Sequence, residues 1–396
     1  KVVLSYYPAN STDRDPLDQY FLEVSKLLKK DYSSLFIYLN DISKISQAEK
    51  FINKNKDTYG FIDAYIFFKD YKSIIVDYYR INKKLKSIKL SNLFIFEEIN
   101  YIDLFKNDWL ISISHLLIIL IIIEKKFNNF FLKNPSIKEV LYLAEFQPWE
   151  LMLNKIANLH NVKTKAVTHA VIRPNLLQYH HSKMIHEFLY NPNFIGANSD
   201  LSKSVYLQNG FKTHQVLKIE AQRFNYLLNI SKKNKNKKKL NKRSILITTS
   251  INHDETKELL EIFSLSNIEF DKVYIKEHPN LPVKLIIENS IKNFPSYEIV
   301  TGSISNVLEF SDIVLTANGS SVLLEAVVAK KQTISLISLS ALPMPAIERS
   351  SNLYFVFNHN SLSEVLKKLI SDKGDKNQVK NLENYLYLDT ELKLWD

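Results

Sequence analysis

Residues 244–279 read SILITTSINHDETKELLEIFSLSNIEFDKVYIKEHP. A β-branched apolar run (244–251) comes first, a segment with helical spacing follows, and a second apolar run ends at Pro279. Short apolar runs that alternate with helical segments predict right-handed βαβ units, with helices on both faces of a parallel sheet. The alternation continues to about residue 371. This part of the chain therefore predicts a doubly wound α/β domain.

The first half of the chain shows the same alternation in a less regular form. We expect strands in the segments KVVLSYY (1–7), SLFIYLN (34–40), AYIFF (64–68), LFIFEEI (93–99), VLYLAEF (140–146), AVTHAVI (166–172) and FIGANS (194–199). Helical spacing separates some of them, at residues 17–30, 45–55 and 149–160. A second α/β domain is therefore expected before the first apolar run quoted above.

A length of 396 residues corresponds to two or three domains of ordinary size. We predict a first domain at 1–230, a basic linker at 231–243, a second domain at 244–375 and a C-terminal segment at 376–396 that packs back on the first domain. Two Rossmann-like, doubly wound domains of this kind predict a binding cleft lined by the carboxyl ends of the strands.

Composition excludes several classes of protein. Cysteine is absent, which excludes disulfides, thiolate zinc sites and a cysteine nucleophile. Glycine occurs only six times, and no two glycines lie closer than fourteen residues. Neither a G-x-G-x-x-G turn nor a P-loop is therefore present, which argues against P-loop ATPases, protein kinases and the usual dinucleotide oxidoreductases.

The net charge of +10 is concentrated in one place. The stretch 231–243 (SKKNKNKKKLNKR) holds eight Lys and Arg and no acid, so the other 383 residues carry only +2. We interpret the stretch as a solvated linker and expect no nucleic-acid partner. Contact of this stretch with phosphates or with an anionic membrane is the alternative.

The longest apolar stretch is WLISISHLLIILIII, residues 109–123. At 1.5 Å per residue its fifteen residues span about 22 Å as a helix, less than the hydrocarbon thickness of about 30 Å. We expect a buried helix or strand pair, with docking on a membrane surface as the alternative. The chain opens with a strand-like segment and shows no signal peptide. The expected location is cytoplasmic, with peripheral contact at the inner face of the membrane kept open.

The segment TANGSSVLLEA (316–326) carries a candidate phosphate site. A strand is expected to end at Thr316, and a helix to begin after a turn through Asn318 and Gly319. Amide N–H groups at the helix start and the hydroxyls of Ser320 and Ser321 favour an anion there, and Glu325 lies one turn further on, within reach of a ribose diol. Ordinary helix capping is the alternative interpretation.

A second candidate is Lys276-Glu277-His278-Pro279. The strand VYIKEH ends at His278, and Pro279 turns the chain away from the sheet. The imidazole is expected at the same sheet edge as the serine pair, where it donates to a departing phosphate or protonates it. A purely structural histidine is the alternative.

The first domain supplies carboxylates in VLYLAEFQPWELMLNKIA (140–157). A strand that ends at Glu145 exposes that side chain at the carboxyl edge of the sheet. Glu150 falls in the first turn of the following helix. Its negative charge there either interacts favourably with the positive end of the helix dipole or takes part in catalysis. Trp149 stacks on a sugar or simply packs.

Further candidates lie in AVTHAVIRPNLLQYHH (166–181). His169 is placed among the catalytic residues, and Arg173 and Tyr179 among the substrate-binding ones, since arginine binds carboxylates in two-pronged fashion. The histidines 180, 181 and 186 lack cysteine partners and an H-E-x-x-H pattern, so we expect no metal site. Asp13-Arg14-Asp15 mimics the D-x-D of metal-dependent sugar transferases but lies in a loop near the N-terminus.

Several motifs together resemble one family. They are Glu145-x-Gln147-Pro148-Trp149-Glu150, His169 with Arg173-Pro174 and Tyr179, Glu220-Ala221-x-Arg223-Phe224, Lys276-x-His278-Pro279, and Ser320-Ser321 with Glu325-Ala326. The set resembles bacterial surface-carbohydrate biosynthesis glycosyltransferases of GT-B fold, over about residues 140–330. The His-Pro and Ser-Ser pairs are also similar to those of Kdo transferases and capsule polysialyltransferases, where they bind the phosphate of a CMP-activated sugar. Similar pairs occur in glycerol-phosphate polymerases, and the Arg-Pro-Asn sequence after His169 departs from the family pattern.

The resemblance implies a metal-independent transferase that moves a sugar from a CMP-linked donor, such as a 3-deoxy-ulosonic acid, to a surface glycan or glycolipid. No cofactor beyond the donor is implied. Lys276, His278, Ser320 and Ser321 would stabilise the departing phosphate, Glu325 would hold the ribose, and Arg223 would contact substrate. Glu145 or Glu150 would act as general base or nucleophile. The alternatives are a nucleotide-sugar 2-epimerase or a glycerol-phosphate-type transferase of the same fold, and a non-catalytic nucleic-acid- or membrane-docking protein.

Overall fold

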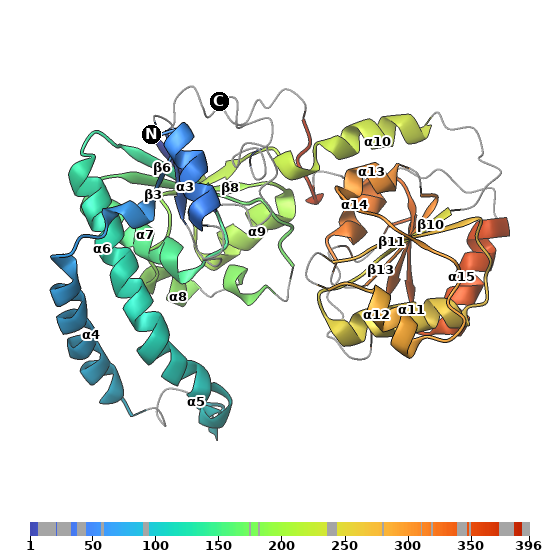
Figure 1. Ribbon diagram of the computed structural model, residues 1–396, viewed down its shortest axis with the longest axis horizontal. Coiled ribbons are helices and arrows are strands. Elements are labelled where there is room, and N and C mark those ends of the chain that lie inside the picture. Colours follow the sequence, from blue (N-terminus) through green and yellow to red (C-terminus); the bar gives the residue numbers. More distant parts are fainter. Residues whose placement is uncertain are drawn as a thin grey trace. The chain divides into compact units, whose positions relative to one another are not determined.

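The structure is a computed structural model (Figure 1). It describes residues 1–6, 21, 33–37, 45–56, 59–89, 95–173, 176–180, 183–235, 244–278, 281–309, 311–317, 320–338, 347, 350–371 and 384–389. The chain forms two compact units. The first comprises residues 1–169, 181–197 and 205–217, and the second comprises residues 170–180, 198–204 and 218–396.

The first unit is built on a parallel sheet. Its strands are β1 (Val2–Tyr6), β2 (Ser33–Ile37), β3 (Tyr59–Phe61), β6 (Glu139–Leu143), β7 (Lys163–Val167), β8 (Phe194–Ala197) and β9 (Val216–Lys218), in the order β3-β2-β1-β6-β7-β8-β9. The pairings from β3 to β8 are parallel. The chain proceeds outward from β1 on one side and from β6 on the other, so the point where the strand order reverses lies between β1 and β6.

Helices separate these strands along the chain. They are α3 (Ile45–Lys54), α4 (Asp70–Lys86), α5 (Ile102–Ile111), α6 (Leu117–Lys133), α7 (Pro148–Leu159), α8 (Lys183–Phe188) and α9 (Asp200–Asn209). The next helix, α10 (Tyr226–Lys235), follows β9 and belongs to the second unit. In Figure 1, α4 runs alongside the long helix formed by α5 and α6, in agreement with the contacts between α4 and α6.

Two predicted strands of the first half are wrong. The segment 64–68 is not a strand: β3 ends at Phe61, and a 3-10 turn follows at Ile62–Tyr65. The chain reverses direction within the segment 93–99. It forms a hairpin of two short antiparallel strands, β4 (Ile95–Phe96) and β5 (Ile99–Asn100), each two residues long. Glu97 and Glu98 adopt positive φ values of 49° and 66° at that turn. Glutamate is not a usual turn residue, which is why the apolar pattern hid the reversal.

The apolar stretch 109–123 is helical but only partly buried. It runs from α5 through a π-helical turn at Ser112–Leu116 into α6, and Asn82 of α4 donates its side-chain amide to the Ile113 carbonyl inside that turn. Ile113 and Ile121 are buried, whereas four large side chains are exposed: Leu110, Ile111, Leu116 and Ile119. The structure therefore confirms the helix but not the strand pair, and the predicted burial holds for only part of its surface. Within the described ranges, no helix combines the length and apolarity required to cross a bilayer.

The second unit has a six-stranded parallel sheet. Its strands are β10 (Ser244–Thr248), β11 (Lys272–Lys276), β12 (Glu298–Ile299), β13 (Ile313–Ala317), β14 (Gln332–Leu336) and β15 (Leu353–Val356). The order β12-β11-β10-β13-β14-β15 is the strand order of a Rossmann fold, with the reversal between β10 and β13. The helices are α11 (His253–Leu265), α12 (Lys284–Ser290), α13 (Ile304–Leu308), α14 (Val322–Val328) and α15 (His359–Ser371).

The two faces of this sheet explain the apolar runs. Ile245 and Ile247 of β10 point into a core formed with α11, α12 and α15, whereas Leu246 points into a second core that includes α10, α13 and α14. All five residues of β10 and of β13 are buried. A strand that is covered on both faces reads as a continuous apolar run rather than an alternating one. The prediction of two Rossmann-like α/β domains is confirmed.

The unit boundaries differ from simple cuts in the sequence. The first five residues of the predicted linker 231–243 belong to the end of α10, and the positions from 236 to 243 lie outside the described residues. Near the C-terminus, Leu386 is part of the second unit's core. The Tyr387 N–H donates to the Asn198 carbonyl, and its own carbonyl accepts from Ala221 N–H, all within the second unit.

Candidate functional site

In the second unit, the predicted phosphate-binding residues follow two strands on either side of β10. His278 follows β11 and Ser320 lies three residues after β13, while Thr249, which the sequence did not single out, follows β10 itself. Parallel neighbouring strands end at one edge of the sheet, and the loops that leave β10 and β13 diverge there. The fold therefore brings these groups to the edge where a doubly wound sheet binds its ligand.

His278 is held through its backbone. Its N–H donates to the Thr249 hydroxyl at 3.1 Å, and its carbonyl accepts from Leu281 N–H at 3.0 Å. Partial burial and the neighbouring positive charge of Lys276 lower the pKa of His278. A lowered pKa favours the neutral imidazole, which can donate one N–H. Lys276 donates to the Glu277 carbonyl at 3.2 Å.

The two serines make different hydrogen bonds: Ser320 bonds to the backbone of α14, and Ser321 bonds to the Glu325 carboxylate. The Ser320 hydroxyl accepts from Val322 N–H at 3.2 Å, which is the capping interaction expected at the start of α14. The Ser321 hydroxyl donates to Glu325 at 3.4 Å, and the Tyr226 hydroxyl donates to the other oxygen of that carboxylate. Burial raises the pKa of Glu325, while these two donors and the positive charge of Arg223 act in the opposite direction.

Arg223 and Tyr226 are consequently neighbours of the nucleotide-binding candidates. Arg223 lies in a 3-10 turn at Gln222–Phe224, exposed to solvent, and α10 begins at Tyr226. The sequence placed Arg223 among substrate contacts of the first domain, whereas residue 218 onward belongs to the second unit. Pro279, Asn318 and Gly319 lie outside the described residues.

In the first unit, Glu145 stands at the end of β6, next to the reversal between β1 and β6. The strand ends at Leu143, so Glu145 lies two residues beyond it and not at its last position. Its carboxylate accepts from the Gln147 side-chain amide at 2.7 Å, and Gln147 in turn accepts from the Trp149 indole N–H at 3.1 Å. His169 Nε2 lies 3.3 Å from the same carboxylate. Glu145 is therefore a positioned, partly exposed carboxylate with a histidine partner.

His169 itself follows β7, which ends at Val167, so its predicted place inside a strand is wrong. Thr168 N–H donates to the Gly196 carbonyl of β8, and this bond continues the sheet by one residue before the chain leaves it. The departure turns His169 toward the loop that carries Glu145. The sequence identified both residues but gave no sign that they meet.

Glu150 is buried and caps the loop that carries Glu145. As the third residue of α7 it accepts from the N–H of Glu145 at 3.1 Å and from the N–H of Phe146 at 2.9 Å. Phe146 has a φ of 54°, a conformation that costs free energy in any residue with a side chain. The carboxylate of Glu150 therefore holds a strained loop in place.

The charge state of Glu150 differs from the expectation based on the helix dipole. Burial raises its pKa to about 8, and the backbone N–H groups of Glu145, Gln147 and Phe146 offset only part of that rise. The sequence located Glu150 in the first helical turn but contained no information on its burial. A carboxyl that holds its proton near neutral pH is not suited to act as a nucleophile.

Of the residues predicted to contact substrate, Trp149 and Tyr179 are buried and Arg173 is half-buried. Trp149 is buried and packs edge-on against Tyr142, which supports a packing role for Trp149 rather than stacking on a sugar. Tyr179 is also buried. Arg173 belongs to the second unit, where burial lowers its pKa and the negative charge of Glu255, at the start of α11, acts in the opposite direction.

Two residues of these sites were not singled out from the sequence. Thr249, which anchors His278, follows an apolar strand and resembles many other threonines in such positions. Tyr226, which donates to Glu325 from ninety-nine residues away, has no local signature at all. Among the described residues, no three His, Asp or Glu side chains gather in a way that would hold a metal ion. The absence of a metal remains a prediction, because Asp13, Asp15 and His181 lie outside those residues.

A hollow of about 690 Å³ opens elsewhere in the second unit. It is lined by residues at the amino ends of β11 and β12, among them Lys272, Tyr274, Tyr297 and Glu298. Ligands of doubly wound sheets bind at the opposite, carboxyl edge. The position of the hollow therefore argues against its being the nucleotide site.

Comparison with known proteins supports the fold. No family model and no curated protein matches the chain. The UDP-GlcNAc 2-epimerase of Neisseria meningitidis, solved with UDP-GlcNAc, is 13% identical over 96% of this chain and 94% of its own, with a TM-score of 0.54. The UDP-GlcNAc 2-epimerase of Methanocaldococcus jannaschii, solved with UDP-GlcNAc and UDP, is also 13% identical, covers the same shares and has a TM-score of 0.51. MnaA of S. aureus, solved with UDP, is 12% identical over 98% and 92%, with a TM-score of 0.50.

At this level of identity the likeness shows the fold alone. Both sheets of this chain are matched, since the alignments cover nearly its whole length. The chain therefore has the two-Rossmann-domain GT-B fold.

Proposed function

We propose that the protein is a glycosyltransferase that uses a sugar nucleotide as its donor. The proposal rests on the placement of His278, Ser320 and Ser321 after strands that end at the carboxyl edge of a sheet with Rossmann strand order. The Thr249 hydroxyl holds the backbone of His278 in place there. This edge is where such sheets bind nucleotides, and N–H and hydroxyl donors are the groups that bind phosphate oxygens. The matching motifs of the GT-B transferases support the same assignment.

In this proposal His278 acts as a hydrogen-bond donor. A neutral imidazole donates one N–H to a phosphate oxygen without supplying a proton, and Lys276 contributes positive charge nearby. Ser321 and Tyr226 are oriented by Glu325, which is buried behind them. Because Glu325 is buried and both of its oxygens already accept hydrogen bonds, the ribose contact expected of it from the sequence stays a prediction and is not part of this proposal.

Glu145 is the proposed general base. The acceptor hydroxyl gives its proton to the Glu145 carboxylate while its oxygen forms a bond to the anomeric carbon of the donor. The bond between that carbon and the phosphate oxygen breaks, and the nucleotide leaves with the electron pair. His169 and Gln147 hold the carboxylate in place. The buried, capping position of Glu150 supports Glu145 over Glu150 in this role.

The donor is proposed to be a CMP-linked 3-deoxy-ulosonic acid, such as Kdo or a sialic-acid-like sugar, and the acceptor a bacterial surface glycan or glycolipid. The His-Pro and Ser-Ser pairs support CMP. Solved proteins of the same fold hold UDP or UDP-GlcNAc, so a uridine nucleotide is the competing donor. Thermal shifts with CMP, CDP, UDP and GDP distinguish the two, because a bound ligand raises the unfolding temperature according to its affinity.

The phosphate site is tested with variants. His278→Ala and the pair Ser320→Ala/Ser321→Ala should weaken nucleotide binding in calorimetry, by on the order of 1.5–3 kcal/mol for each lost charge-assisted bond. His359→Ala, which removes an exposed histidine at the start of α15, is the control and should bind normally. Unchanged affinity in both site variants would place the nucleotide elsewhere.

The base is tested by turnover. Glu145→Gln should abolish transfer and leave nucleotide affinity intact, whereas Glu150→Gln should retain measurable transfer. The reverse result would assign the reaction to Glu150.

A 2-epimerase is the second candidate, because solved structures that share this fold at TM-scores of 0.50 and above include 2-epimerases. An epimerase converts its sugar nucleotide into an epimer without any acceptor. A transferase releases nucleotide in proportion to acceptor consumed. Incubating UDP-GlcNAc with the protein alone and recording proton NMR spectra separates the two: the appearance of the epimer would refute the transferase assignment.

A further inference from the structure

One face of α4 is apolar and points away from the protein. Ile74 and Asn82 of α4 are buried against the first unit, Asn82 at the end of the helix where it reaches the Ile113 carbonyl. Five large side chains on the outward face are exposed, and we call them the α4 stripe: Phe68 (93% exposed), Tyr71 (53%), Ile75 (52%), Val76 (56%) and Tyr79 (69%). Tyr71, Ile75 and Tyr79 follow one another at intervals of four residues, and Val76 lies three residues before Tyr79 on the neighbouring row. Phe68 stands in the turn just before the helix.

Such a row differs from ordinary surface composition. Single exposed apolar side chains are common on soluble proteins, but contiguous groups of large ones mark an interaction surface. Burial of α4 needs only its inner face, which is already packed on α6. The α4 stripe therefore contributes nothing to the core of the unit, and its exposure needs another explanation.

The surroundings of the stripe are strongly basic. Residues 69–89 contain seven Lys and Arg and two Asp, a net charge of +5. Lys72, Lys83 and Lys86 are exposed and share the face of the stripe, since Lys72 precedes Val76 by four residues and the other two follow Tyr79 by four and seven. The basic charge thus lines both ends of the apolar row.

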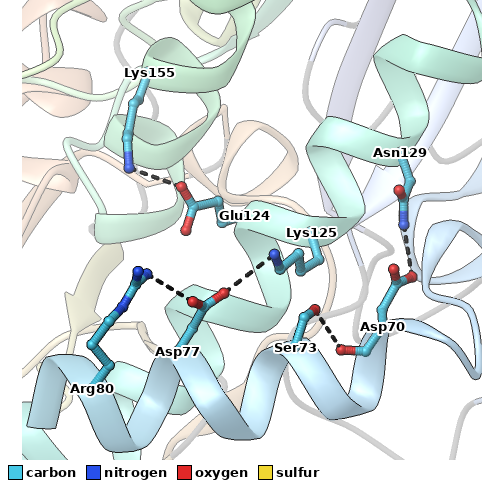
Figure 2. Close-up of polar contacts among 8 residues, drawn as sticks. All are labelled: Asp70, Ser73, Asp77, Arg80, Glu124, Lys125, Asn129 and Lys155. Carbon is cyan, nitrogen blue, oxygen red and sulfur yellow. Dashed lines mark hydrogen bonds and ion pairs between the residues drawn. The ribbon is translucent and has the colours of Figure 1, made fainter.

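The two acids are occupied on the inner side. Asp77 pairs with Lys125 of α6 at 3.3 Å and with Arg80 at 2.7 Å. Asp70 accepts from the Asn129 amide of α6 at 2.8 Å. Figure 2 shows both aspartates directed toward these partners. The negative charges therefore secure α4 against α6 and do not neutralise the outward lysines.

Ion pairs and a hydrogen bond also hold α4 in place on the first unit. Glu124 of α6 pairs with Lys155 of α7 at 2.8 Å, so that α4, α6 and α7 are linked in series by ion pairs (Figure 2). Asn82 adds a hydrogen bond to the Ile113 carbonyl. A helix held in this way presents its outer face as a fixed surface and does not have to order itself on binding.

We propose that the α4 stripe and its lysines bind the headgroup region of an anionic lipid bilayer, with α4 lying parallel to the membrane. Aromatic and aliphatic side chains enter the boundary between headgroups and acyl chains, and the lysines contact anionic headgroups while their methylene stems lie along the apolar row. The inference does not depend on the proposed function.

Charge distinguishes this occupant from a second copy of the chain. Two copies that met through their α4 stripes would bring two segments of charge +5 together, and like charges across an interface repel. An anionic bilayer supplies both an apolar interior for the stripe and negative charge for its ends. The stretch 109–123, for which membrane docking was the alternative, has a smaller set of exposed side chains and two acids close by at Asp103 and Asp108.

The test is sedimentation of the full chain with lipid vesicles. Vesicles of phosphatidylcholine alone and of phosphatidylcholine mixed with phosphatidylglycerol are compared at low salt and at about 0.15 M salt. The wild type should sediment with the mixed vesicles only, and less so at the higher salt. Ile75→Ser/Tyr79→Ser and Lys83→Glu/Lys86→Glu should each lower the partition coefficient by about tenfold or more.

Matched controls keep the result specific. Leu159→Ser removes an equally exposed leucine (70%) from α7, and Lys50→Glu/Lys54→Glu reverses two exposed lysines of α3. Both should bind vesicles like the wild type. Because all these positions are exposed, unfolding temperatures of the variants should remain within the wild-type range, and nucleotide-induced thermal shifts report on the proposed function separately.

Three outcomes would overturn the proposal. The wild type does not bind anionic vesicles, the two α4 variants bind as well as the controls, or binding disappears only when the stretch 231–243 is replaced by a neutral linker. Self-association of the wild type that the α4 variants abolish, without vesicle binding, would identify the stripe as an interface between copies instead.

Discussion

Glu150 provides the sharpest test of the site, because its pKa links a buried contact to a measurable pH dependence. Its pKa lies at about 8 in the folded chain, against an ordinary value of 4.5. Between these two values the unfolded carboxyl is ionised while the folded one holds its proton. Folding must then take up a proton, so stability is greatest at low pH and falls as the pH rises toward 8.

The size of the effect follows from the difference between the two pKa values. Each pKa unit corresponds to about 1.4 kcal/mol, so the wild type should lose roughly 4 kcal/mol of unfolding free energy between about pH 5 and pH 8 through this group. Glu150→Gln removes the titration. Its amide oxygen can still accept from the Phe146 and Glu145 N–H groups, which the Oε2 atom serves in the wild type. The stability advantage of Glu150→Gln over the wild type should therefore grow with pH.

Urea unfolding followed by tryptophan fluorescence measures this, since Trp149 adjoins the site and is buried. Wild type, Glu150→Gln and Glu187→Gln are compared at about pH 5, 6.5 and 8.5. Glu187 is exposed on α8, so its variant should follow the wild type at every pH. Parallel curves for wild type and Glu150→Gln would refute the reasoning: Glu150 would then be ionised in the folded chain, with its charge held by the backbone N–H groups, and its candidacy as a nucleophile would revive.

Two further predictions concern the rest of the protein. EDTA should leave the transfer reaction unchanged, because His278, Lys276 and the serine hydroxyls supply the positive potential that a metal would otherwise provide. Activity that is lost with EDTA and restored by Mg²⁺ or Mn²⁺ would overturn the metal-free mechanism. Gly210→Ala should lower the unfolding free energy by about 1–3 kcal/mol, because Gly210 has a φ of 115° and an added Cβ would lie 3.1 Å from the His186 ring. Gly302→Ala, at φ 84° with open space around it, isolates the backbone part, and an equal loss in both variants would show that the contact with His186 does not matter.

The sheets and the edges that carry the site were predictable from the sequence. β10 and β13 were found because a parallel strand covered on both faces is apolar throughout, and such a run is visible without any tertiary information. β11, whose residues alternate between buried and more exposed, was found from its short apolar run before Pro279. His278 and Ser320 follow those strands directly. Since parallel strands end at one edge, strand assignment alone brought them together.

Turns formed by residues that seldom occur in turns were not predictable from the sequence. The hairpin at β4 and β5 reverses at Glu97 and Glu98, and the loop after β6 passes through Phe146 with a positive φ. Nothing in the local pattern favours these conformations. They are maintained by the rest of the fold, as the bond from Phe146 N–H to Glu150 illustrates.

The sequence by itself determined where the strands lie and which polar residues end them, because both depend on neighbours in the chain. Only the tertiary structure decided the environment of those residues. Glu150 looks like an ionised helix-start carboxylate in the sequence, yet burial raises its pKa. Arg223 and Tyr226 precede the second sheet in the chain but accompany Glu325 beside it. Burial and long-range partners depend on how distant segments pack together, and the spacing of neighbouring residues does not predict that packing.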